Sequence, residues 1–324
     1  MTQRNRSRTE MADITRYDHG IFAIDSHFLR PRLDAIHVIV EAGRAAIVDT
    51  ATNASVPVVL EALTALGLAA EQVDYVILTH IHLDHAGGAG ELMARLPNAR
   101  LAVHPRGARH MADPTRLIEG TIAVYGEAAT SRMYGDILPV PGARIVEAGE
   151  GTTLSLGGRE LLFLDTPGHA RHHVCIVDRG SGHIFAGDTF GMSYRELDCD
   201  GRQFVFPTTT PVQFEPALLH RSVERLVSFA PEAIYVTHYG QVRDVPRLAA
   251  DLHRLIDLHA ELAQRLREAG AARPQRLREG VRAIVLAEAR RQSWPLGEAE
   301  LLAVFATDVE LNAQGLDAWL ETLR

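Results

Sequence analysis

Three histidines and one aspartate fall within six residues of the stretch Thr79-His80-Ile81-His82-Leu83-Asp84-His85-Ala86-Gly87-Gly88. The apolar run at 75–78 precedes this stretch and predicts a short buried strand. Imidazole and carboxylate groups are ligand types for zinc and similar divalent metals. In an extended loop, alternation places His80 and His82 on one side, and Asp84 and His85 can turn toward a second point. The stretch predicts a metal site; the alternative is a polar loop whose histidines cap a helix.

Three further metal-ligand residues also follow apolar runs. His169 lies in a Thr-Pro-Gly-His turn, Asp188 in a Gly-Asp pair, and His238 in a Val-Thr-His-Tyr run. Together with residues 79–88, these turns resemble the HxHxDH signature and the later ligand turns of the metallo-β-lactamase superfamily. The resemblance covers roughly residues 20–245, and the four turns occur in the family's order.

The resemblance implies an α/β fold, namely an αββα sandwich with the metals at one edge between two sheets. It implies that His80, His82 and His169 hold one metal ion. It implies that a second ion is held by Asp84, His85 and His238, while Asp188 bridges the two. Zinc is the default from the ligand types, and iron or manganese fits the same nitrogen and oxygen set.

Single positions distinguish the branches of this superfamily. Asp188 stands where many true β-lactamases carry a cysteine, and His82 stands where the flavodiiron relatives carry a glutamate. We find no long RNA-binding arm of the kind that the tRNA-processing endonucleases carry. The set resembles that of glyoxalase II and the metal-dependent lactonases. Glyoxalase II holds glutathione partly with lysine, which this sequence lacks entirely.

The expected activity is hydrolysis of a small thioester, ester or lactone by a metal-bound hydroxide. Asp84 would orient this nucleophile and take a proton. Tyr194 and Tyr239 lie close in sequence to ligands, and either phenol could polarise a substrate carbonyl, as a tyrosine does in the lactonases. The alternatives are phosphodiester hydrolysis and a metal-binding sensor or interaction protein.

The composition and net charge of the sequence limit the kinds of partner that we expect. The 324 residues carry a net charge of -8, which argues against a nucleic-acid partner. The absence of lysine excludes Schiff-base chemistry and a Walker-type phosphate grip. No stretch approaches the ~20 apolar residues of a membrane span. Two cysteines, Cys175 and Cys199, cannot form a disulfide framework, so we expect a reduced, cytoplasmic protein with a small-molecule substrate.

The texture of the sequence predicts three regions. Residues 1–12 form a flexible tail, 13–245 form the metallo-β-lactamase-like domain with alternating strands and helices, and 246–324 form a helical C-terminal region. Leucines at helical spacing give residues 246–269 one apolar face that must be buried. We expect this region to roof the active site and to support a homodimer; a helical cap that only covers sheet surface is the alternative.

Other residues give weaker signals. His172 and His173 follow His169 closely and are candidates for supporting a ligand. Met133 and Tyr134 lie in an irregular helical stretch that could form a lid. The segment after Asp188 is rich in large side chains, which either wall a substrate pocket or anchor the C-terminal helices: Phe190, Met192, Tyr194, Phe204 and Phe206.

Overall fold

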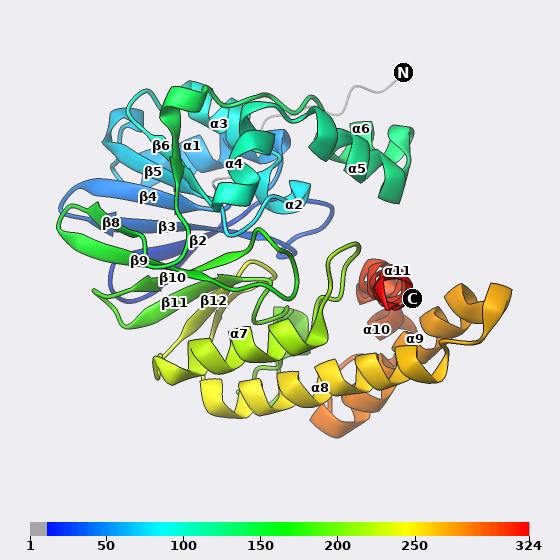
Figure 1. Ribbon diagram of the computed structural model, residues 1–324. Coiled ribbons are helices and arrows are strands. Elements are labelled where there is room, and N and C mark those ends of the chain that lie inside the picture. The colour runs from blue at the N-terminus through cyan, green and yellow to red at the C-terminus, as the bar shows by residue number, and fades with distance from the viewer. Residues whose placement is uncertain (1–11, 324) are drawn as a thin grey trace, which may run out of the picture.

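The computed structural model describes residues 12–323. Two β-sheets pack face to face, and helices cover the outer face of each (Figure 1). This is the αββα arrangement predicted from the sequence, and the prediction is confirmed. The expected tail at 1–12 falls almost wholly on residues 1–11, which lie outside the described residues.

The first sheet has the strands in sequence order. The first four strands pair antiparallel and the later neighbours pair parallel. Its strands are β1 (Ile14–Arg16), β2 (Ile21–Asp25), β3 (Ala35–Glu41), β4 (Arg44–Val48), β5 (Val73–Ile77), β6 (Arg100–Val103) and β7 (Ile145–Glu147).

The second sheet has the order β13-β12-β11-β10-β9-β8, and its neighbours pair antiparallel except for β11 with β12. Its strands are β8 (Thr153–Leu156), β9 (Arg159–Asp165), β10 (Val174–Asp178), β11 (His183–Gly187), β12 (Ile234–Val236) and β13 (Gly240–Val242). Every residue of β10 and β11 is buried, as expected for strands covered on both faces.

Helices follow the strands and continue beyond the second sheet. They are α1 (Val56–Ala65), α2 (Leu83–Ala86), α3 (Ala89–Arg95), α4 (Pro105–Ala112), α5 (Thr115–Tyr125), α6 (Glu127–Tyr134), α7 (Pro216–Ser228), α8 (Val245–Arg265), α9 (Arg273–Gln292), α10 (Glu298–Val304) and α11 (Ala306–Thr322). Within residues 12–323, every helix is too short or too polar to cross a lipid bilayer.

Three apolar layers hold the sandwich together. The middle layer lies between the sheets and includes Ile39, Phe163 and Phe185. A second layer packs the first sheet against α1, α3 and α4, and a third packs the second sheet against α7 and α8 (Figure 1). Both sheets are buried on both faces, so a cluster of polar side chains finds room where the strands end rather than on either face.

The C-terminal helices extend this outer layer. The leucines at helical spacing on α8 are all buried, and the first two pack with second-sheet residues such as Ile234: Leu248, Leu252, Leu255 and Leu262. α9 packs on α8 and α11, so the last helices form a group beside the sandwich (Figure 1). The division of the chain into domains at 245 remains a prediction. At this boundary, α8 shares an apolar core with the second sheet.

Candidate metal centre

Four strand ends deliver the predicted ligands to one place. The loop after β5 carries His80 and His82 and turns into the short α2, which carries Asp84 and His85. The turns after β9, β11 and β12 carry the other three, namely His169, Asp188 and His238. The chain reverses at each of these points, so a side chain just past a strand end projects beyond the sheet rather than into its core.

One group of ligand atoms consists of three histidines. The Nδ1 atom of His82 lies 2.9 Å from Nε2 of His80 and 3.0 Å from Nε2 of His169. Their ligand atoms lie within 4.8 Å of one another. Nitrogens bound tetrahedrally at the usual zinc distance lie about 3.4 Å apart, so the three imidazoles converge at close to the spacing of ligands on one ion.

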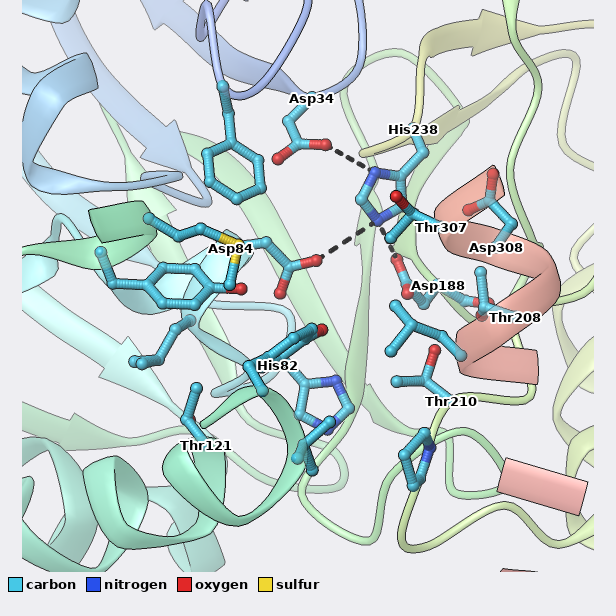
Figure 2. Close-up of a pocket in the computed structure, with 18 of the residues that line it drawn as sticks. Asp34, His82, Asp84, Thr121, Asp188, Thr208, Thr210, His238, Thr307 and Asp308 are labelled. Atoms are coloured by element: carbon cyan, nitrogen blue, oxygen red, sulfur yellow. Dashed lines mark hydrogen bonds and ion pairs between the residues drawn. The ribbon is translucent and has the colours of Figure 1, made fainter. Parts of the chain in front are cut away.

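A second group forms around Asp84, His85 and His238, whose ligand atoms also lie within 4.8 Å. The Oδ2 atom of Asp84 lies 3.8 Å from Nε2 of both histidines. Figure 2 shows the carboxylate of Asp84 pointing toward the imidazole of His238, with Asp188 beside His238.

Asp188 lies between the two groups. Its Oδ1 atom is 3.3 Å from Nε2 of His85 and 3.4 Å from Nε2 of His238. Its Oδ2 atom is 3.5 Å from Nε2 of His169. One carboxylate therefore turns one oxygen toward each group of histidines, which is the geometry of a bridging ligand.

The donor set fits divalent metal ions. Among the described residues, Nε2 of His85 and Oδ1 of Asp188 are buried without a hydrogen-bond partner, although both are strongly polar. Nitrogen and carboxylate oxygen donors around an otherwise unsatisfied point are typical of sites for zinc and related ions.

The charges within the centre shift its pKa values in opposite directions. Burial and the neighbouring imidazoles hold the pKa of His80 and His82 well below the usual range, which favours the neutral form that binds metals. Burial also opposes protonation of His85 and His238, but the surrounding carboxylates together outweigh it and raise their pKa, with Asp188 acting on both, Asp49 on His85 and Asp34 on His238. Burial raises the pKa of Asp188, yet His238, His85 and His169 together bring it well below its usual range.

Two buried carboxylates orient the histidines of the second group. Nδ1 of His85 lies 2.8 Å from Oδ2 of Asp49, and Nδ1 of His238 lies 2.7 Å from Oδ1 of Asp34. Each carboxylate accepts the Nδ1 proton, so Nε2 is left free for a metal. Neither aspartate was predicted from the sequence. Asp49 directly follows the apolar strand β4, a signal that was available; Asp34 lies in an irregular segment without one.

Asp49 also connects the two sheets. It accepts hydrogen bonds from the backbone N–H of Thr79 at 2.8 Å and from Oγ1 of Thr237 at 2.8 Å. Thr79 precedes the first ligand histidine and Thr237 precedes His238. One side chain therefore fixes the loops that deliver both groups of ligands.

Further hydrogen bonds fix the Asp188 and His169 turns. The Nε2 atom of His173 accepts the backbone N–H of Asp188 at 3.2 Å, while Oγ1 of Thr208 lies 3.1 Å from Nδ1 of His169. His173 therefore supports a candidate ligand, whereas His172 lines the adjoining cavity. The contact from Thr208 was not expected from the sequence.

A cavity of about 620 Å³ opens beside the candidate ligands (Figure 2). His82, Asp84, Asp188 and His238 line its inner end. Its other walls come from segments far apart in the sequence, within the ranges 28–34, 110–134, 208–213 and 303–311. Met133 and Tyr134 are among the lining residues, and so are residues of α10 and α11. Both the region around 105–140 and the C-terminal helices thus border the candidate site.

The two candidate catalytic tyrosines lie in different surroundings. Tyr194 lines the cavity, and its O–H donates to the carboxylate of Asp308, with both oxygens at 3.1 Å. Burial, reinforced by Asp308, raises the pKa of Tyr194. Tyr239 packs against Ala23 and Ala35 and is not among the described residues that line the cavity.

The other large side chains after Asp188 pack inside the protein. Phe190 belongs to the core beneath the second sheet. The remaining three pack with Trp294 and Phe305, which lie in the connections between the C-terminal helices: Met192, Phe204 and Phe206. Of the two interpretations left open by the sequence, anchoring of these helices describes this segment, apart from Tyr194.

Comparison with known proteins defines the family. Residues 31–238 match the family model described as Metallo-beta-lactamase superfamily, and this range contains all seven candidate ligands. The chain belongs to the metallo-β-lactamase superfamily.

Relatives and solved structures place the chain within this large group. A hydroxyacylglutathione hydrolase of Acidiphilium cryptum is 30% identical over 237 residues, covering 72% of this chain and 76% of the relative. The metallo-beta-lactamase fold-containing protein ST1585 of Sulfurisphaera tokodaii is 27% identical over 180 residues, which cover 53% of this chain and 62% of that protein.

The crystal structure of ST1585 superimposes with a TM-score of 0.63 at 20% identity, covering 93% of this chain and 99% of that one. The metallo-beta-lactamase family protein TTHA1429 of Thermus thermophilus gives 0.60 at 22% identity, covering 94% of this chain and 93% of that one. The two structures show a shared fold.

Proposed function

We propose that this protein is a dinuclear metal-dependent hydrolase that acts on a small acyl compound, namely a thioester, an ester or a lactone. The observation that carries the proposal is the position of Asp188, with Oδ1 facing His85 and His238 and Oδ2 facing His169. The similarity to a hydroxyacylglutathione hydrolase, an enzyme named for a thioester substrate, supports the acyl class.

In this proposal, one ion is held by His80, His82 and His169, and the other by Asp84, His85 and His238. Asp188 binds both. When bound, such ions lower the pKa of a coordinated water toward neutrality and polarise a carbonyl oxygen. Zinc is the metal we expect, since imidazole dominates the ligand set; iron or manganese would also fit.

The side chains themselves perform the remaining work. Asp84 is partly exposed to the cavity, at 29% of its side-chain surface, so its carboxylate can accept the proton of an attacking water. Asp49 and Asp34 hold His85 and His238 in the orientation that leaves Nε2 for the metal. The substrate binds with its carbonyl toward these groups and its remainder in the cavity.

The roles of the two tyrosines follow from their surroundings. Tyr194 is a candidate for contact with substrate, but its proton is donated to Asp308. To polarise a carbonyl, its O–H would have to turn away from that carboxylate. Tyr239 packs against Ala23 and Ala35, outside the lining of the cavity. A direct catalytic role would require the substrate to reach its phenol there.

Three general properties complete the proposal. A cytoplasmic location is in keeping with Cys175 and Cys199, which are both free thiols. We retain a small molecule, rather than nucleic acid or membrane, as the expected partner. A homodimer that uses part of the region 246–324 remains a prediction.

A substrate panel tests the reaction class. In a panel of chromogenic esters, thioesters, lactones and phosphodiesters, protein loaded with zinc should hydrolyse at least one ester, thioester or lactone, and His169→Ala should abolish this turnover. His253→Ala is the matched control, because His253 lies on α8 and its ring stacks on His220 instead of facing the cavity. Turnover of phosphodiesters alone would favour the phosphodiesterase alternative. Full metal loading without any turnover would favour a sensor.

A further inference from the structure

The cavity beside the candidate ligands has apolar walls on two facing sides. α5 contributes Leu117, Val124 and Tyr125, which recur at helical spacing on one side of the helix. The opposite wall comes from the end of α10 and the start of α11, with Val304 and Leu311. Figure 1 shows the α5–α6 pair and α11 on facing sides of the region beyond the sheet edge.

α5 is only partly covered by the rest of the protein. It is an eleven-residue helix rich in apolar side chains, yet none of its residues is fully buried. A helix with an apolar face normally buries that face against the protein core. Here Leu117 packs against Phe28 and Tyr134, while Val124 stays half-buried at the cavity wall, so a bound apolar group would add contacts there.

The mouth of the cavity is apolar as well. Leu29 and Val212 line it and are 59% and 63% exposed, the two most exposed large apolar side chains among the described residues. Exposed apolar side chains that gather at a cavity typically mark a binding surface for an apolar group.

Two charged groups on the walls are engaged within the protein. Arg30 forms an ion pair with Glu196 at 2.7 Å, and its guanidinium stacks over the ring of Tyr194 at 4.4 Å. Asp308 accepts the O–H of Tyr194. Arg116, at an exposed position of α5, and Asp34 also line the cavity, so its walls carry charges of both signs rather than a cluster of cations that would select a strongly anionic ligand.

We infer that the cavity between α5–α6 and α10–α11 binds an apolar acyl chain, so that the substrate class is a neutral ester, thioester or lactone of an alkanoic acid. This inference rests on the proposed function for the reaction, while the binding of the chain rests on the cavity alone. Selectivity then comes from the lining of α5 and α11, and Val124 is a specificity-determining residue.

A chain-length series tests the inference on the metal-loaded protein. kcat/KM for acetyl, butanoyl, hexanoyl and octanoyl esters of one leaving group should rise by up to about fourfold for each added methylene that the cavity buries. The rise should come mainly from KM. A hydroxyacyl glutathione thioester should be a poorer substrate than the octanoyl thioester. Equal rates across the series, or a preference for the glutathione thioester, would overturn the inference.

A charge introduced into the α5 wall of the cavity can be compared with the same charge placed outside the cavity. Val124→Glu should reduce the octanoyl-to-acetyl ratio of kcat/KM toward one. Ala128→Glu adds the same charge on α6, at an exposed residue that does not line the cavity, and should keep the native ratio. A native ratio in Val124→Glu would contradict the assignment of this wall.

A binding measurement separates the inference from the reaction. Calorimetry with hexanol, octanol and decanol should show affinity that rises with chain length in the native protein and in Ala128→Glu, and falls in Val124→Glu. If the protein hydrolysed none of the acyl compounds but still bound the alkanols, the proposed function would be refuted and the inference about the cavity would stand. Alkanol affinity that is absent, or equal in all three proteins, would refute the inference itself.

Discussion

The Oδ1 atom of Asp188 lies 3.4 Å from Nε2 of His238, while the Oδ2 atom of the same carboxylate faces His169. β11 and β12 are parallel neighbours. Asp188 directly follows the end of β11, and His238 follows the end of β12 after one intervening residue. The sheet therefore positions Asp188 between two groups of histidines that come from other turns.

Neutralising this carboxylate should be more damaging than any other single carboxylate change. In Asp188→Asn, two dications would face each other without the shared negative charge, so we expect loss of metal and of kcat/KM by more than about 100-fold. Metal content by mass spectrometry and turnover should fall together. Asp257→Asn, at an exposed aspartate of α8, is the control. Native metal content in Asp188→Asn would refute the bridging role.

Asp49→Asn should weaken metal binding without removing a ligand. Asparagine is close in shape but lacks the charge that accepts the Nδ1 proton of His85, and partners of this kind are typically worth about 10- to 100-fold in metal affinity. Competition with a chelator measures the change. An affinity equal to that of the native protein would show that Asp49 acts only as a connection between the sheets.

The last helix should stabilise the loop that supports His169. The side chain of Asn312 accepts the backbone N–H of Thr209 at 2.8 Å and donates to the carbonyl of Pro207 at 3.0 Å. Asn312→Ala leaves both backbone groups buried without a partner, so the free energy of unfolding should fall by about 2–4 kcal/mol. Gln314→Ala on the same helix should change it by less than about 0.5 kcal/mol. Equal stability of the two variants would contradict this role of α11.

His259 should make the protein sensitive to acid. It is fully buried on α8, and burial lowers its pKa to about 4. The unfolded chain binds this proton near pH 6.5, so stability is lost as the pH falls from about 6.5 toward 4, by about 3 kcal/mol in total. His259→Leu should reduce this loss, measured as the difference in urea unfolding between pH 7.5 and 4.5. An identical pH dependence in both proteins would refute it.

The candidate ligands could be predicted because each is a rare residue type close after an apolar run. His80, His169, Asp188 and His238 all follow strands that the sequence pattern also predicts. The sandwich follows from the same strands and from the resemblance of these turns to one family. β7 and β13 have only three residues each, too few for an alternating pattern to stand out, and were not predicted.

The cavity could not be predicted in the same way. Leu29, Val124, Val212 and Leu311 meet there from four distant segments, and nothing in the local sequence of any one indicates the others. Asp34 likewise orients a ligand through its contact with His238, 204 residues away. Such roles depend on tertiary packing rather than on local pattern.

The central claim is that two metal ions act together at Asp188, and a metal titration tests it most directly. Metal-free protein should be titrated with zinc while bound metal and ester or thioester turnover are both recorded. We predict that binding saturates at two ions per chain and that full turnover requires the second ion. Saturation at one ion with full turnover, or full turnover without metal, would contradict the account.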